Sequence, residues 1–133
     1  MSNTFGPDGN LPLDPSMAFT LIIPEQATVT LTFSSVADWE NGICVYDANY
    51  NLLGTRGNQA GWSLTPPIVI PAGKTATSCI ITGWHKEGPA DPSKPWVQSD
   101  YKITGEPDLE VVVGFNDTGS TNYNNIEATI AFS

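Results

Sequence analysis

Strict alternation of apolar and polar side chains is the feature of this sequence that most restricts its fold. In residues 27–33 (ATVTLTF) every second residue is apolar, and each residue between them is a threonine. A period of two recurs in residues 109–115 (LEVVVGF) and 126–132 (IEATIAF). Because successive side chains of a β-strand point to opposite faces, each stretch predicts a strand with one buried face. No helical period competes with this pattern.

Further strands are predicted between turn residues that recur at short intervals. The remaining candidates are residues 18–23, 43–47, 51–54, 67–70, 75–83 and 96–103. Pro, Gly and Asn separate them, which is typical of the turns in an antiparallel sandwich. A chain of 133 residues is long enough for one domain with a real core. We therefore predict a single antiparallel β-sandwich, jelly-roll-like, of about eight strands.

The first residues differ from the rest because they are rich in Gly, Pro and Asp. Residues 1–16 are expected to form an extended N-terminal arm or a loosely packed lead-in. No linker or internal repeat divides the remainder, so residues 1–133 are interpreted as one domain.

The charge balance restricts the partners. The formal net charge is −9, from 14 acidic and 5 basic residues. Nucleic acid and anionic lipid both attract basic patches, so neither is an expected partner. The start has no basic or apolar region of a signal peptide, and no apolar run could span a bilayer. We expect no membrane insertion, and a protein that is cytoplasmic or secreted without a classical signal peptide.

The two cysteines, Cys44 and Cys79, both lie in predicted strands. Two cysteines are too few for a disulfide framework. Buried thiols are the favoured interpretation, and a single bridge is the alternative if the two strands lie opposite each other.

Little catalytic chemistry is available. The chain has one histidine, His85, and it lacks a GxSxG nucleophile motif and a phosphate-binding Gly loop. One histidine and two separated cysteines serve zinc poorly. We therefore expect a protein that is not an enzyme.

The stretch GFNDTGSTNYNN, residues 114–125, is the most distinctive loop. Asp117 supplies a carboxylate, and the asparagines, Ser120 and Thr121 supply further side-chain and backbone oxygens. Calcium prefers six to eight such oxygens, although the pattern of an EF-hand is absent. The alternative is an ordinary turn, because Asn, Asp, Gly and Ser are common in any turn.

The stretch FNDTGSTNYNNIEATIAF resembles the C-terminal hairpin of the LecA-type (PA-IL-like) bacterial galactose-binding lectins. The matching positions, at the same spacing, are Phe115, Asn116, Asp117, Thr121, Asn124 and Asn125. The family's Pro-Gly between the Asp and the Thr is replaced here by Thr-Gly-Ser. The resemblance implies one calcium ion that binds sugar hydroxyls directly.

The resemblance also implies roles for individual residues. Side chains of Asp117, Asn124 and Asn125 and the carbonyl of Thr121 would hold the ion. Asp117 and Asn124 would also contact the sugar, and Thr118 would add a backbone contact.

Two upstream matches are open for a second calcium-binding loop, one near Asn41 and one at Glu87. The family's sugar-contacting histidine has no clear counterpart, and His85 is the candidate. Because lectin sites use an aromatic face against the sugar ring, Trp84 is a further candidate.

The sequence thus predicts a calcium-dependent lectin that binds a galactoside-type carbohydrate. We expect a homo-oligomer, dimer or tetramer, because single-site sugar affinity is weak and linked sites raise it. Two alternatives remain: a structural or assembly β-sandwich subunit, which the arm favours, and a small acidic membrane-binding protein of the cytolysin type.

Overall fold

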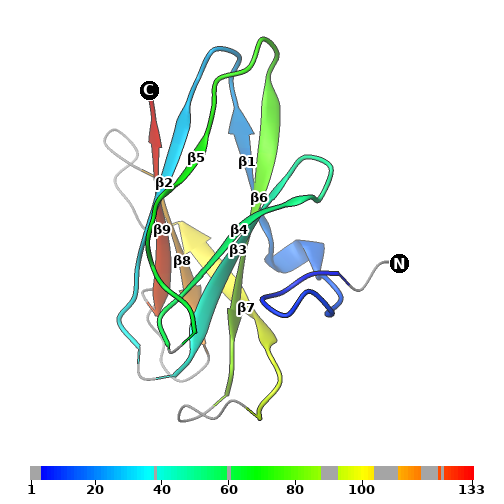
Figure 1. Cartoon of the computed structure of the whole chain (residues 1–133), viewed down its shortest axis with the longest axis vertical. Coiled ribbons are helices and arrows are strands. Elements are labelled where there is room, and N and C mark those ends of the chain that lie inside the picture. The colour runs from blue at the N-terminus through cyan, green and yellow to red at the C-terminus, as the bar shows by residue number, and fades with distance from the viewer. Residues whose placement is uncertain are drawn as a thin grey trace.

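The computed structural model describes residues 4–37, 39–59, 61–87, 93–103, 111–117, 123 and 125–133. These parts contain nine strands and one 3₁₀ helix (Figure 1). The elements are η1 (Pro15–Met17), β1 (Phe19–Ile23), β2 (Val29–Ser34), β3 (Asn41–Asp47), β4 (Leu52–Gly57), β5 (Ile68–Ile70), β6 (Thr77–His85), β7 (Val97–Ile103), β8 (Val111–Asn116) and β9 (Ile126–Phe132). The predicted all-β antiparallel sandwich is confirmed. The short η1 is the only described helix, and no described helix is long and apolar enough to cross a membrane.

The strands pair in the order β4-β3-β6-β7-β8-β9-β2-β5, and β1 pairs with β6 outside this path. We call β1, β3, β4 and β6 the first sheet, and β2, β5, β8 and β9 the second sheet. Strand β7 joins them, because residues 97–99 pair with β6 and residues 100–103 pair with β8. All of these pairings are antiparallel.

The main core lies between the two sheets. Seven of its members come from the three stretches where the sequence alternates, and seven come from β1, β3, β5 and β6. They are Leu21, Ile23, Val29, Leu31, Ile43, Val45, Ile68, Cys79, Ile81, Val113, Phe115, Ile126, Ala128 and Ile130. Gly83 of β6 lies very close to the second sheet, because a Cβ added there would overlap the ring of Phe115. At this point the missing side chain lets the sheets meet.

A second core covers the outer face of the first sheet. It consists of Phe5, Cys44, Tyr46, Ile80, Trp84 and Trp96, with Leu11, Leu13, Ala18 and Trp62 packed against it. Strand β3 therefore has apolar neighbours on both faces, and six of its seven residues are buried. The continuous apolar run ICVY is explained by this double burial.

The N-terminal segment supplies much of that cover. The expected extended or loosely packed arm is wrong for the described residues, because they fold back on the first sheet. Phe5 and Leu11 exchange two backbone hydrogen bonds of 3.0 Å each. The amide of Gly6 donates to the hydroxyl of Tyr46 at 2.9 Å. Buried apolar side chains on the outer face of β3 and β6 are the physical reason, since they would otherwise lie in water.

Both cysteines are free and buried, which confirms the thiol interpretation. Cys44 belongs to the outer core, and Cys79 belongs to the core between the sheets. Because they face opposite sides of the first sheet, no bridge can join them without a change in the strands.

We expect Gly83→Ala to destabilise the fold by about 2 kcal/mol, because the new methyl group must displace Phe115 in a packed core. Gly73→Ala is the matched control, since the nearest atom to its Cβ would lie at 3.6 Å, an ordinary contact. Urea denaturation of both variants gives the free energy of unfolding. Equal stabilities would contradict the close contact between the sheets.

The buried thiols should make stability fall at alkaline pH. Burial raises the pKa of Cys44 and of Cys79 to about 11. In the unfolded state the thiols ionise near their ordinary pKa, whereas in the folded state they stay protonated. Their contribution to the free energy of unfolding is therefore fully present below about pH 9. It is lost as pH rises through about 11. Urea denaturation between these values should show a shallower pH slope for Cys44→Ala than for the parent, and identical slopes would contradict the prediction.

Candidate functional site

The candidate site lies at the end of the sandwich where β3 begins and where β6 and β8 end. Asn41 opens β3 and is the register partner of His85, the last residue of β6. Asp117 follows β8, and Asn125 precedes β9. Since β8 and β9 pair from Phe115 and Ile126 outward, Asp117 and Asn125 meet across the hairpin.

Asp117 joins the two sides of this site. Its side chain is buried, and the residue is 3% exposed. The side-chain amide of Asn41 donates to Asp117 Oδ2 at 3.0 Å, across 76 residues of sequence. The backbone N–H of Asp117 donates to Asn125 Oδ1 at 3.2 Å. The structure therefore brings together Asp117 and Asn125, two of the candidate ligands, with Asn41 as their third member.

The side-chain carbonyl oxygen of Asn41, Oδ1, is a buried acceptor, and it has no hydrogen-bond partner among the described residues. A flipped amide is not an alternative, because Nδ2 already serves two acceptors, Asp117 Oδ2 and the carbonyl of Trp39. An unsatisfied buried acceptor costs about 1–3 kcal/mol. This oxygen belongs to the same side-chain amide whose nitrogen donates to Asp117 Oδ2.

A network of amides fixes Asn41 in place. Asn58 Oδ1 accepts from the backbone N–H of Asn41 at 2.8 Å. Asn58 Nδ2 donates to Ser35 Oγ and to the carbonyl of Trp39, both at 3.1 Å. Ser35 Oγ in turn donates to the carbonyl of Asn125. Asn58 and Ser35 were not predicted, and the only signal in the sequence is that Asn58 lies in a loop rich in Gly and Asn.

The far side of the hairpin loop is held against the second sheet at Tyr123. A Cβ added at Gly114 would overlap the carbonyl oxygen of Tyr123, so only glycine allows this approach. The hydroxyl of Tyr123 donates to Asp100 Oδ2 at 3.1 Å. This hydrogen bond is the main reason that the pKa of Tyr123 is raised.

Several predicted site residues lie outside the described part of the chain. These are Thr118, Thr121 and Asn124. Their roles as calcium ligands and sugar contacts stay predictions.

His85 reaches the same end of the sandwich but is only 1% exposed. Its Nδ1 lies 2.7 Å from Ser99 Oγ, and its Nε2 lies 2.8 Å from Glu87 Oε2. A serine, a histidine and a carboxylate in series resemble a hydrolytic relay. Ser99 is buried within a strand, however, so no substrate can reach its hydroxyl. The arrangement ties the end of β6 to β7, and it gives a direct sugar contact by His85 no support.

The side chain of Trp84 points to the outer face of the first sheet. It is buried in the outer core under the N-terminal segment, and its Nε1 donates to Thr82 Oγ1 at 2.8 Å. Its ring offers no exposed face, so the geometry gives no support to Trp84 as an aromatic platform for a sugar. Of the two upstream loops, the one at Asn41 contacts Asp117 directly. The carbonyl of Glu87 instead accepts from Lys94 Nζ at 2.6 Å.

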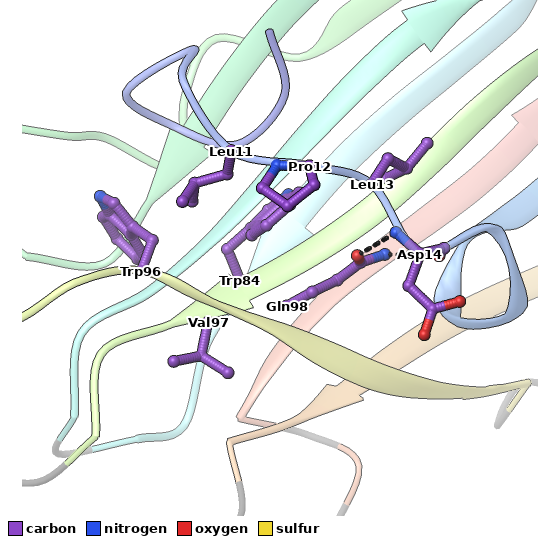
Figure 2. Close-up of a pocket in the computed structure, with 8 residues that line it drawn as sticks. All are labelled: Leu11, Pro12, Leu13, Asp14, Trp84, Trp96, Val97 and Gln98. Carbon is purple, nitrogen blue, oxygen red and sulfur yellow. Dashed lines mark hydrogen bonds between the residues drawn. The ribbon is translucent and has the colours of Figure 1, made fainter. Parts of the chain in front are cut away.

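A cleft lies between the N-terminal segment and strands β6 and β7, and its volume is about 340 Å³. Figure 2 shows the residues that line it, which are Leu11, Pro12, Leu13, Asp14, Trp84, Trp96, Val97 and Gln98. Gln98 Oε1 accepts from the backbone N–H of Asp14 at 2.8 Å, and Gln98 Nε2 donates to the carbonyl of Asp14 at 3.0 Å. The walls of the cleft are mainly apolar. The polar groups of Gln98 are already bonded to the backbone of the N-terminal segment.

The donor set restricts the metal. Among the described residues, no three His, Cys, Asp or Glu side chains gather in a group that could hold a metal ion. Zinc, which prefers nitrogen and sulfur ligands, does not fit. A carboxylate with amide and backbone oxygens fits calcium, a hard cation.

Comparison with known proteins identifies the fold. No family model and no curated protein matches the sequence. Among solved structures, the Chromobacterium violaceum lectin CV2L, determined in complex with alpha-methyl-fucoside, matches with a TM-score of 0.57. The match has 15% sequence identity and covers 86% of this chain and 94% of that chain. The C-terminal domain of the Burkholderia cenocepacia lectin BC2L-C matches with a TM-score of 0.54. That match has 13% identity and covers 84% of this chain and 91% of the other. The chain therefore has the fold of these two bacterial lectins.

The anchoring of the loop can be tested through the phenol of Tyr123. We expect Gly114→Ala to push the backbone of Tyr123 away from β8, because a Cβ cannot fit there. The phenol should then leave Asp100, and the pKa of Tyr123 should fall toward its ordinary value. An NMR titration of the tyrosine rings measures this pKa. Asp100→Asn is the control that should lower the same pKa without moving the backbone, and an unchanged pKa in both variants would contradict the contact.

Proposed function

We propose that this chain is a calcium-dependent carbohydrate-binding protein, and that its site is the end of the sandwich formed by Asn41 and the hairpin loop 114–125. The observation that carries the proposal is the buried cluster of Asn41, Asp117 and Asn125. In it a buried carboxylate accepts from a side-chain amide whose own carbonyl oxygen has no partner among the described residues.

The residues present fit a calcium ion. Asp117 supplies a carboxylate, and Asn41 Oδ1 is an acceptor already desolvated. Side chains of Asn124 and Asn125 and the carbonyl of Thr121 complete the proposed protein ligands. Asp117 is the only acidic residue in the loop 114–125, so the protein oxygens are mostly neutral. When bound, the ion supplies open coordination positions that hydroxyl groups of a sugar can occupy.

The proposed ligand is a neutral hexoside. A sugar without charge suits a protein of net charge −9 better than an anionic ligand does. The likeness in fold to two bacterial lectins supports carbohydrate as the ligand class. The resemblance of the hairpin favours a galactoside, whereas CV2L was solved with a fucoside. Both sugars therefore belong in the test.

The structure gives less support to the features that motivate the two alternative functions. Assembly was favoured by an extended arm, but Phe5 is buried against the chain's own first sheet. A cytolysin-like protein requires exposed aromatic side chains at a membrane. All four tryptophans are described and none is exposed, since Trp84 and Trp96 are buried and Trp39 and Trp62 are half-buried. The exposed aromatic side chains among the described residues are Tyr50, in the turn between β3 and β4, and Phe132, at the end of β9.

Calcium should stabilise the folded protein. At a tenfold excess of calcium over its dissociation constant, the free energy of unfolding should rise by about 1.4 kcal/mol. This corresponds to a melting temperature higher by a few degrees. Thermal melts in EDTA, in millimolar calcium and in magnesium measure the effect. Asp117→Asn should abolish the calcium shift, and Asp8→Asn, on an exposed loop, should keep it.

Sugar binding is then tested by calorimetry with methyl galactoside and methyl fucoside. Binding should occur in calcium and disappear in EDTA and in Asp117→Asn. A calcium shift that survives in Asp117→Asn would place the ion elsewhere. Binding of either sugar at full strength in EDTA would refute the dependence on calcium.

A further inference from the structure

The backbone of Trp39 is bonded directly to the candidate site. Trp39 lies two residues before Asn41, the first residue of β3. Its carbonyl accepts from Asn41 Nδ2 and from Asn58 Nδ2, both at 3.1 Å. The same nitrogen of Asn41 donates to Asp117 Oδ2 at 3.0 Å. One amide group therefore connects the backbone of Trp39 to the buried carboxylate.

The chain just before Trp39 is attached to the hairpin side of the site as well. Ser35 Oγ donates to the carbonyl of Asn125, and Asn125 Nδ2 donates to the carbonyl of Val36 at 3.5 Å. Val36 is 68% exposed. These contacts place residues 35, 36 and 39 along one border of the site, and they bring apolar side chains to that border.

Trp39 differs from the other three tryptophans because neither core uses its side chain. Trp84 and Trp96 belong to the outer core and Trp62 packs against it, whereas Trp39 contributes to neither core. Within the described part of the chain, Trp39 also makes no ring–ring or cation–π contact. The residue is half-buried. Part of a large aromatic residue thus faces solvent beside a polar site.

The indole N–H of Trp39 is available to a ligand. The hydrogen bonds of Trp39 to other described residues are those of its carbonyl. Asn41 Oδ1 is the one described side-chain polar atom that is both buried and without a partner. Since Nε1 of Trp39 has no partner and is not counted there, it is accessible to water.

A hexoside presents two kinds of surface, and Trp39 complements the one that an ion cannot bind. Hydroxyl groups of the sugar suit a calcium ion. The ring C–H groups form an apolar surface, which suits the electron-rich face of an indole, and the indole N–H can donate to a further hydroxyl. Because two site amides already hold the carbonyl of Trp39, binding requires little further ordering of its backbone.

We propose that Trp39 is the aromatic residue on which the apolar face of the bound hexoside lies, and that it contributes to sugar specificity. This role rests on the proposed function, because the ion at Asp117 would hold the hydroxyl groups of the same sugar. It assigns to Trp39 the aromatic contact for which the buried ring of Trp84 offers no exposed face.

Calorimetry in calcium with methyl galactoside and methyl fucoside tests the contact. Trp39→Leu keeps an apolar side chain but removes the aromatic face, so it should weaken sugar binding by about tenfold. Trp39→Phe should recover part of this loss. Trp62→Leu is the matched control, because Trp62 is the other half-buried tryptophan and packs on the outer core. This control should bind sugar like the parent.

Two further readouts separate a sugar contact from a structural role. The calcium-induced rise in melting temperature should be the same in Trp39→Leu as in the parent, because no atom of the Trp39 side chain is a proposed ligand of the ion. Sugar added in calcium should change the tryptophan fluorescence of the parent and of Trp62→Leu, since the sugar removes water from an indole. The fluorescence of Trp39→Leu should stay constant.

The outcomes distinguish this role from the proposed function. Undiminished sugar affinity in Trp39→Leu would overturn the role of Trp39 and leave the calcium-dependent site intact. Loss of the calcium shift in Trp39→Leu would also overturn it, because Trp39 would then act on the metal site. A parent that binds neither sugar in calcium would contradict the proposed function itself, and the role of Trp39 with it.

Discussion

The contact of Phe115 with Gly83 determines where the two sheets meet, and the candidate site follows from it. Phe115 is the last core side chain of β8, and Gly83 lies two residues before the end of β6. The ring can lie on β6 only because Gly83 has no side chain. With β8 held this close, Asp117 reaches Asn41 at the start of β3. The hydrogen bond from Asn41 to Asp117, which are 76 positions apart, thus depends on the packing of Phe115 against Gly83 in the core.

The strands and much of the core could be predicted from the sequence, because a half-buried strand imposes a period of two that a single stretch reveals. Val29, Leu31, Ile126, Ala128 and Ile130 are all inward, as their spacing indicates. The N-terminal segment could not be predicted, because Gly- and Pro-rich chain has no period. Its position depends on the outward apolar side chains of β3 and β6. The sequence does not distinguish these side chains from those of the core between the sheets.

The candidate site was only partly predictable for a related reason. Asp117 and Asn125 share one hairpin, so their proximity follows from local pairing. Asn41 and Asn58 join the site through tertiary contacts. The residue type of an asparagine does not indicate which residue it will contact in the fold. For Trp84 and His85 residue type favours a sugar contact, but the burial of both side chains gives such a contact no support. Trp84 points to the outer core, and His85 is enclosed by Ser99 and Glu87.

The direction of β9 has a practical consequence for how this protein can be displayed. Strand β9 starts beside Asn125 and carries the chain to the opposite end of the sandwich, where the C-terminus lies in Figure 1. Its seven residues span about 24 Å at the usual rise of about 3.4 Å per residue. A sensor surface or a fused reporter attached at Ser133 would therefore hold the molecule with the end that carries Asn41 and Asp117 away from the attachment. Immobilisation through the N-terminal segment would instead pull on the cover of the first sheet.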